Sequence, residues 1–109
     1  MTSDNFERVA KVGDIREADM ISVMLSNGAE VLLAKCKGEV FCVDIMCTHQ
    51  EAWLDSGYVD ANTCEIGCPL HEGRFDLRTG AVTNEPPTEP IRAYNVKVEG
   101  NDVFVGPPK

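Results

Sequence analysis

Short runs of apolar, β-branched residues cover much of the chain, and polar turn residues separate them. Residues 20–46, "MISVMLSNGAEVLLAKCKGEVFCVDIM", are divided by Asn27-Gly28 and Lys37-Gly38. Asn-Gly is a strong hairpin signal because both central turn positions require positive φ. The pattern predicts two consecutive hairpins in this part of the chain.

The C-terminal third shows the same alternation. Tyr94, Val96 and Val98 alternate with polar residues, residues 99–102 form a turn signal, and residues 103–105 return as a strand. "RFDLRTGAV" is a further strand candidate that turns at Thr79-Gly80, whereas "NEPPTEP" has too many prolines for a central strand. No long segment has helical periodicity, and "EAWLDSG" could form one helical turn at most. These elements predict an all-β, antiparallel sandwich or barrel.

The 109 residues of the chain fit a single domain, 1–109, that can hold a core without disulfides. No apolar run reaches the roughly 18 residues needed to span a membrane, so no membrane association is expected. The N-terminus lacks the basic and apolar regions of a secretory signal, so a cytoplasmic location is expected. Five cysteines in such a chain are not expected to form disulfides.

The formal net charge of −8 excludes nucleic acid as a favoured partner, because phosphates would be repelled. Residues 47–76 hold six acidic side chains against the single basic Arg74. These carboxylates could be an ordinary solvated surface. As a set, they suggest a docking face for a basic partner.

The same segment holds both histidines of the chain in two matching pairs. Cys47-x-His49 is followed, after eighteen intervening residues, by Cys68-x-x-His71. Two thiolates and two imidazoles could hold zinc in a tetrahedral site. They could equally hold a [2Fe–2S] cluster with the cysteines on one iron and the histidines on the other.

"CTH" followed by "CPLHEGRF" resembles the Rieske cluster motif, and the similarity to small ferredoxins of bacterial aromatic ring-hydroxylating dioxygenase systems extends over the whole chain. The resemblance implies an antiparallel β-sandwich with an inserted cluster-binding subdomain of two loops, at about 46–76, and a Pro-rich cover loop at about 84–90. It also implies one Rieske [2Fe–2S] cluster. Its expected ligands are Cys47 and Cys68 on the inner iron and His49 and His71 on the outer iron.

The family implies an electron carrier, expected to be monomeric, between an FAD-dependent ferredoxin reductase and a terminal oxygenase. An oxygenase activity of its own would need a mononuclear iron held by two histidines and a carboxylate, and the cluster uses both histidines. The chain is therefore not expected to be an enzyme. The alternative is a Cys2His2 zinc-bound structural or interaction module.

The other cysteines have no ligand role in this interpretation. Cys36 and Cys42 lie in apolar strand runs and are expected to be small core residues. Cys64 precedes Cys68 by four residues but lacks the spacing to His71, so it is expected to be a structural or surface thiol. Trp53 and Phe75 are expected to be core or shielding residues.

Respiratory-type Rieske proteins carry an extra cysteine in each loop, and a serine and a tyrosine whose hydroxyls bond to sulfur in the cluster region. The matching positions in this chain are Glu51, Leu70, Gly73 and Phe75. Fewer hydrogen bonds to sulfur stabilise the added electron less. The sequence therefore predicts a potential at the low end of the Rieske range, roughly −150 mV.

Overall fold

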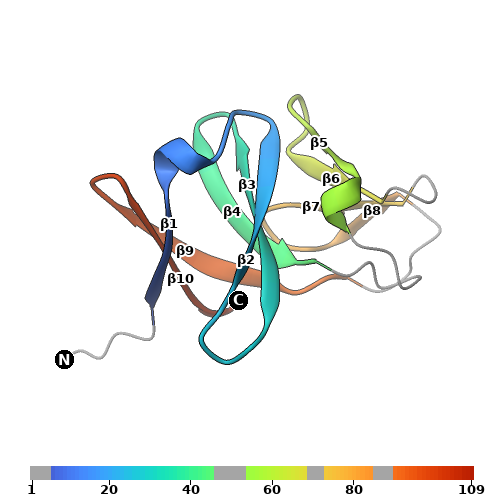
Figure 1. The fold of residues 1–109 in the computed structure, drawn as a ribbon. Helices are drawn as coiled ribbons and strands as arrows, with labels where there is room; N and C mark the ends of the chain where they lie inside the picture. The colour runs from blue at the N-terminus through green and yellow to red at the C-terminus, as the bar shows by residue number, and fades with distance from the viewer. Residues whose placement is uncertain (1–5, 46–53, 69–72, 85–89) are drawn as a thin grey trace.

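The computed structural model describes residues 6–45, 54–68, 73–84 and 90–109, and in these ranges the regular structure is two antiparallel sheets with two short 3₁₀ turns. The expected all-β antiparallel fold is confirmed. The larger sheet has the strand order β1-β10-β9-β4-β3-β2 (Figure 1). Its strands are β1 (Glu7–Lys11), β2 (Asp19–Met24), β3 (Glu30–Cys36), β4 (Glu39–Asp44), β9 (Ala93–Glu99) and β10 (Asp102–Pro108).

The smaller sheet is inserted between β4 and β9 and has the order β5-β6-β7-β8. The sequence did not predict β5 and β6, so the inserted region contains more regular structure than expected. It also continues to Asn84, beyond the predicted end at about residue 76. These strands are only three residues long, too short for a two-residue period to be recognised. The elements are β5 (Tyr58–Asp60), β6 (Glu65–Gly67), β7 (Arg74–Asp76) and β8 (Val82–Asn84), and the 3₁₀ turns are η1 (Val12–Asp14) and η2 (Leu54–Ser56).

The predicted turns lie where the sequence placed them. Gly28, with φ of 90°, connects β2 to β3, and Lys37 and Gly38, with φ of 53° and 80°, connect β3 to β4. Gly80 has φ of 80° between β7 and β8, and Gly100 has φ of 61° between β9 and β10. Turn chemistry is local, so short sequence signals predict it well.

The central strands β3 and β4 are buried on both faces. Leu32 and Ala34 belong to a core cluster shared with the second sheet, whereas Val31 and Leu33 belong to a cluster within the curled first sheet. This division follows from the two-residue alternation of side chains along a strand. It also explains why the sequence of β3 is a nearly continuous apolar run rather than an alternating one.

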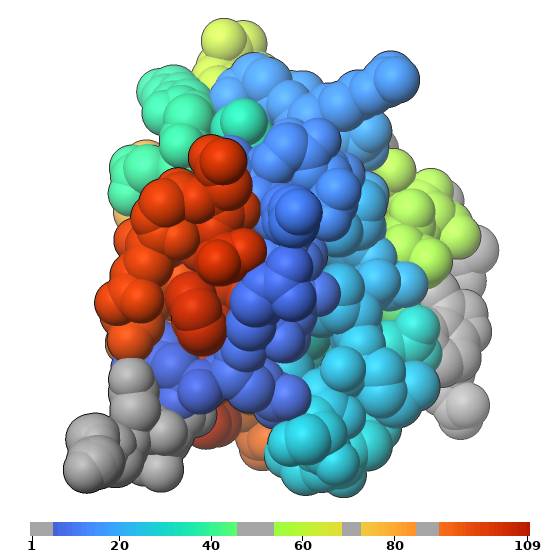
Figure 2. All heavy atoms as spheres, turned by 60° about the vertical axis from the view of Figure 1, so that its left-hand side comes forward, coloured from blue at the N-terminus to red at the C-terminus, as the bar shows by residue number. Residues whose placement is uncertain are grey.

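The first sheet curls until its edge strands β1 and β2 approach one another. The amide and the hydroxyl of Ser26 both donate to the Glu7 carboxylate at 3.1 Å, which joins β1 to the turn after β2. Figure 2 shows β1 on the surface between β10 and the region of β2. No helix in the described part of the chain has the length and apolar character needed to cross a membrane.

A disulfide joins Cys36, the last residue of β3, to Cys64, in the turn before β6. The expectation that no disulfide forms is therefore wrong for these two residues, although both are core residues at 0% exposure. They are separated by 28 positions, and their Cα atoms lie 5.7 Å apart because the second sheet packs on the first. Sequence spacing gave no sign of this contact.

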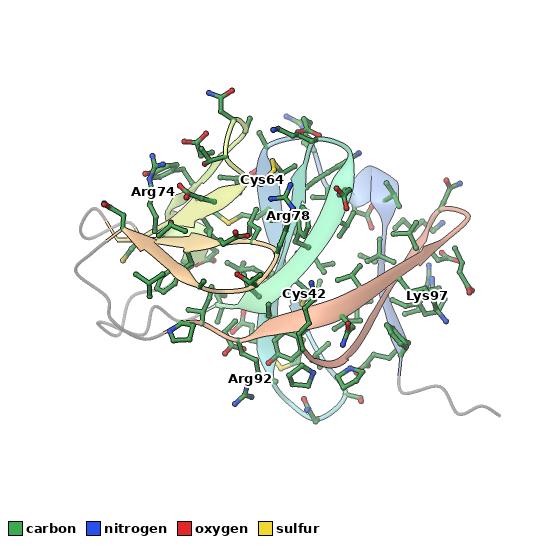
Figure 3. All side chains as sticks on the ribbon, turned by 180° about the vertical axis from the view of Figure 1, so that it is seen from behind. Cys42, Cys64, Arg74, Arg78, Arg92 and Lys97 are labelled. Carbon is green, nitrogen blue, oxygen red and sulfur yellow. A yellow bond between two sulfur atoms is a disulfide. The ribbon has the colours of Figure 1, made fainter. Side chains whose placement is uncertain are left out.

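Arg74 ties three strands of the second sheet together (Figure 3). Its guanidinium donates to the Tyr58 hydroxyl at 3.0 Å, to Asp60 at 3.1 Å and to Glu65 at 3.0 Å. The Tyr58 and Glu65 contacts raise the pKa of Arg74, so its charge is permanent. The pKa of Asp60 is lowered chiefly by the amide of Asn62.

Replacing Arg74 by methionine should lower the thermal unfolding midpoint by several degrees, because the hydrogen bonds and ion pairs that join β7 to Asp60 and Glu65 would be lost. R74K should recover only part of the loss, since an ammonium cannot reproduce the planar fork of donors. R8M is the matched control, because the Arg8–Asp102 pair is exposed on both sides. Equal midpoints for R74M and R8M would contradict this role for Arg74.

Candidate metal centre

Of the four predicted ligands, the structure describes Cys68; Cys47, His49 and His71 lie outside the described residues. Cys68 directly follows β6 and is only 3% exposed. It belongs to the same buried apolar cluster as Ile66 and Phe75. In the described ranges no three histidine, cysteine or acidic side chains gather around a possible metal position, so the ligand set remains a prediction.

The described residues on either side of the first predicted loop are joined directly. The amide of Leu54 donates to the carbonyl of Ile45 at 2.6 Å, and both side chains are buried. Ile45 follows the end of β4, and Leu54 begins η2. The described residues that border the segment 46–53, which holds Cys47 and His49, are thus in direct contact.

The second predicted loop has the same arrangement. The amide of Cys68 donates to the carbonyl of Gly73 at 2.9 Å, one step beyond the Gly67–Arg74 pair of the β6–β7 ladder. The described residues that border the segment 69–72, which holds His71, are therefore joined by the β6–β7 ladder. Strands β6 and β7 fix the position of Cys68, which lies directly after β6 where the second predicted loop begins.

The Pro-rich segment begins and ends beside these two loops. Asn84, at the end of β8, pairs with Arg74, and the amide of Asp44 donates to the carbonyl of Arg92 at 2.9 Å. The described ends that border all three segments lie on the same side of the molecule (Figure 1). The predicted site of two ligand loops and a cover loop stays a prediction, because the segments that would form it lie outside the described residues. Pro90 is exposed, and residues 85–89 of the predicted cover loop lie outside the described residues.

A contact between Tyr94 and Asp44, which nothing in the sequence indicates, joins two of the described ends that border the predicted site. The Tyr94 hydroxyl donates to the Asp44 carboxylate at 2.7 Å. Burial, followed by this hydrogen bond, raises the pKa of Tyr94 to about 12, so the hydroxyl stays a donor at neutral pH. The contact joins the end of β4, which leads into the first loop, to β9, which follows the Pro-rich segment.

The surroundings of Cys68 fit a metal ligand that binds as a thiolate. A buried thiolate in an apolar cluster is costly unless a cation neutralises it. Iron offers that neutralisation, and a soft thiolate suits an iron–sulfur centre. The residues present therefore fit a [2Fe–2S] group with one thiolate in the interior.

Cys42 is also buried, but its surroundings differ from those of Cys68. It is 1% exposed and lies in the other core cluster, on the opposite side of β4 from Phe41 and Val43. Burial, with a smaller effect of the Asp44 charge, raises the pKa of the Cys42 thiol to about 12. It is a free, protonated core cysteine, as expected from the sequence.

A polar hollow of about 460 Å³ lies on the second sheet beside the Arg74 network. Its walls come from Tyr58, Glu65, Arg74, Thr83 and Asn84. Arg74, the one basic side chain of residues 47–76, forms ion pairs with two of the six carboxylates there, Asp60 and Glu65. The net negative charge of the segment is unchanged by this pairing, but these two carboxylates are engaged in contacts within the second sheet.

Comparison with known proteins agrees with this geometry. The family model described as the Rieske [2Fe-2S] domain matches residues 5–95. The ferredoxin component of the naphthalene 1,2-dioxygenase system of Pseudomonas putida is 40% identical over 105 residues, which cover 96% of this chain and 97% of that protein.

Solved structures show the same fold. The ferredoxin of carbazole 1,9a-dioxygenase from Nocardioides aromaticivorans IC177 superposes with a TM-score of 0.87 at 39% identity, covering 96% of this chain and 99% of its own. A ferredoxin-like match in the complex of reduced oxygenase and oxidized ferredoxin in carbazole 1,9a-dioxygenase has a TM-score of 0.87 at 25% identity, with 98% of both chains covered.

The buried cysteine at the hairpin mouth, the joined loop ends and the near full-length matches agree on one conclusion. The chain belongs to the Rieske [2Fe–2S] domain family, and its cofactor is a Rieske-type [2Fe–2S] cluster.

Proposed function

We propose that this chain carries one electron at a time from an FAD-dependent ferredoxin reductase to the terminal oxygenase of a multicomponent aromatic ring-hydroxylating dioxygenase. The observation that carries the proposal is the buried Cys68 at the mouth of the β6–β7 hairpin, in a chain similar over nearly its whole length to ferredoxin components of dioxygenase systems. The solved complex of a similar ferredoxin with its oxygenase supports the acceptor.

The proposed ligands are Cys47 and Cys68 on the inner iron and His49 and His71 on the outer iron. Cys68 supports this division, because its burial fits a position on the interior side. Both histidines of the chain are then ligands, which leaves none for a catalytic mononuclear iron. The chain itself is therefore a carrier and not an oxygenase. The zinc alternative has no support in the comparisons.

When bound, the cluster supplies a one-electron couple whose potential depends on its ligands and surroundings. The chain contributes rigidity. The bonds Leu54 to Ile45 and Cys68 to Gly73, together with the Tyr94–Asp44 contact, fix the described ends of the loops. Fixed ligand positions limit structural rearrangement when the charge changes. The protein needs no substrate pocket, since only an electron crosses the interface.

The docking face would be acidic, and electrostatic attraction would speed association with a basic partner surface. Asp60 and Glu65 are paired with Arg74, so Glu51 and Glu72, each next to or near a ligand histidine in the sequence, are the better candidates. The carrier is proposed to act in the cytoplasm as a monomer.

Replacing Cys68 by serine should abolish cluster binding, because an alcohol does not ionise to replace the thiolate at neutral pH. C42A is the matched control, since Cys42 is a buried thiol of the other core cluster and should leave the cluster in place. Iron and acid-labile sulfide per chain and the visible spectrum measure the result. A coloured C68S protein with full iron content, or colourless zinc-loaded native protein, would contradict the assignment.

The charge reversals E51K and E72K together should slow electron transfer to the oxygenase at low salt, with the difference shrinking as salt screens the interaction. The double variant E39K and E99K changes the net charge equally. Both of its carboxylates are exposed and lie at the β3–β4 and β9–β10 turns, away from the loop ends. Stopped-flow kinetics at several salt concentrations measure the effect. Equal slowing by both pairs would exclude a local docking role.

The midpoint potential should lie at the low end of the Rieske range, roughly −150 mV. Phe75 is 0% exposed and has no hydroxyl, and Gly73 has no side chain, so neither position offers the side-chain hydroxyl that raises the potential in respiratory-type proteins. Spectroelectrochemical titration of the purified protein measures the midpoint. A value above roughly +100 mV would show that other donors supply those hydrogen bonds.

A further inference from the structure

The disulfide between Cys36 and Cys64 has no part in the electron transfer proposed above. It joins β3 of the first sheet to the turn before β6 of the second, and both residues are 0% exposed. In the sequence it encloses β4, the segment 46–53, η2 and β5. It is therefore the covalent link between the base of the fold and the sheet that carries Cys68 (Figure 3).

The backbone around Cys64 connects this link to the metal centre. The Cys64 amide donates to the carbonyl of Asp60 at 2.8 Å, and its carbonyl accepts from the amide of Leu77 at 3.0 Å. Cys64 has φ of 57°, a left-handed conformation that is uncommon for a non-glycine residue. Such a conformation persists when surrounding contacts hold it, and the disulfide is one of them. Cys68 follows four residues later, at the far end of β6.

The reduced form also fits the fold. The Cys36 sulfur lies 3.6 Å from the carbonyl oxygen of Ala61, so a thiol there would find a hydrogen-bond acceptor already in place. Two thiols in an apolar cluster carry no charge and have no large desolvation cost. The pair can therefore be open or closed without exposing an unsatisfied polar group.

A short exposed turn directly precedes Cys64. Ala61, Asn62 and Thr63 are exposed and lie directly before the buried Cys64. The Asp60 carboxylate accepts from the amides of Asn62 at 2.9 Å and Thr63 at 3.4 Å, which holds the turn closed. A reductant would reach the disulfide when this turn opens, without unfolding of either sheet.

We propose that Cys36 and Cys64 form a reversible thiol–disulfide site that a dithiol reductant opens and that controls how firmly the second sheet, and with it the cluster, is held. Cytoplasmic disulfides are commonly redox-sensitive rather than permanent. The part concerning the cluster rests on the proposed ligand role of Cys68, whereas the thiol chemistry does not.

The reaction is an ordinary exchange. A thiolate of the dithiol attacks one protein sulfur, the S–S bond breaks, and the departing protein thiolate takes up a proton. The second thiol of the reductant then attacks the mixed disulfide and releases the other protein thiol. The protein disulfide gains two electrons and two protons, and the dithiol becomes a disulfide. A dithiol is favoured over a monothiol because a 0% exposed pair leaves no room for a lasting adduct.

The first test counts thiols in the native holoprotein at different ratios of reduced to oxidised dithiothreitol. Denaturation in excess alkylating agent should label three of the five cysteines in the closed form and all five in the open form, as read by mass spectrometry. We expect a reversible transition between the two masses. A count fixed at five, or fixed at three, at every ratio would overturn the proposal. In a parallel incubation with reduced glutathione, a stable glutathione adduct on Cys36 or Cys64 would overturn the assignment of a dithiol.

The second test measures cluster release from the visible absorbance after transfer into a chelator. The open wild-type protein and the C36A/C64A variant should both lose the cluster severalfold faster than the closed protein. C42A, which removes a buried thiol outside the pair, should behave like the wild type. Reduced wild-type protein provides the same comparison if the double variant does not fold. Equal release rates in the open and closed forms would overturn the control of cluster retention.

Should C68S retain its cluster while the thiol count still changes reversibly, the ligand assignment would be wrong and the exchange site would stand. If the thiol count stays fixed and C68S is colourless, the exchange site would be wrong and the ligand assignment would stand. The two ideas therefore fail separately.

Discussion

The metal site proposed for this chain depends on backbone hydrogen bonds that join the described ends of the two predicted ligand loops. Leu54 bonds to Ile45, and Cys68 bonds to Gly73, each beside a described strand or 3₁₀ turn. A loop whose ends are fixed has lost much of its freedom before any ligand binds, which would lower the entropic cost of gathering the four proposed ligands. The Tyr94–Asp44 contact extends the same principle to the strand that follows the Pro-rich segment. Local stiffness at strand ends thus prepares the site for its cofactor.

This stiffness comes from the doubly buried centre of the first sheet. Alternation along β3 and β4 sends one set of side chains to the second sheet and the other into the curled interior. The same alternation separates the cysteines by role. Cys42 faces one cluster and stays a protonated thiol, whereas Cys36 faces the other and reaches Cys64. Two cysteines six positions apart in the sequence therefore differ in chemistry because the residues that face them differ.

Charge is distributed less simply than the composition indicates. A net of −8 with an acidic middle segment suggests a broad acidic surface. Arg74 pairs with two of those carboxylates and with Tyr58 across three strands, so part of the negative charge serves the cohesion of the second sheet. The carboxylates of the middle segment that are not paired with Arg74 are the ones left to attract a partner. Charge counts from sequence alone do not show which carboxylates are paired in this way, because pairing depends on which strands lie side by side.

The sequence by itself determined the features that depend on neighbouring residues. The hairpin turns follow from Asn27-Gly28, Lys37-Gly38 and Thr79-Gly80, and the four ligand candidates follow from the spacing of two Cys/His pairs. Tertiary structure alone decided the β5–β6 pairing, the Arg74 network, the Tyr94–Asp44 contact and the Cys36–Cys64 disulfide. Each of these joins residues more than a few positions apart, and their strands are too short or their spacing too irregular to leave a periodic signal. Packing of the second sheet against the first brings Cys36 and Cys64 together, and this packing cannot be inferred from the spacing of the cysteines in the sequence.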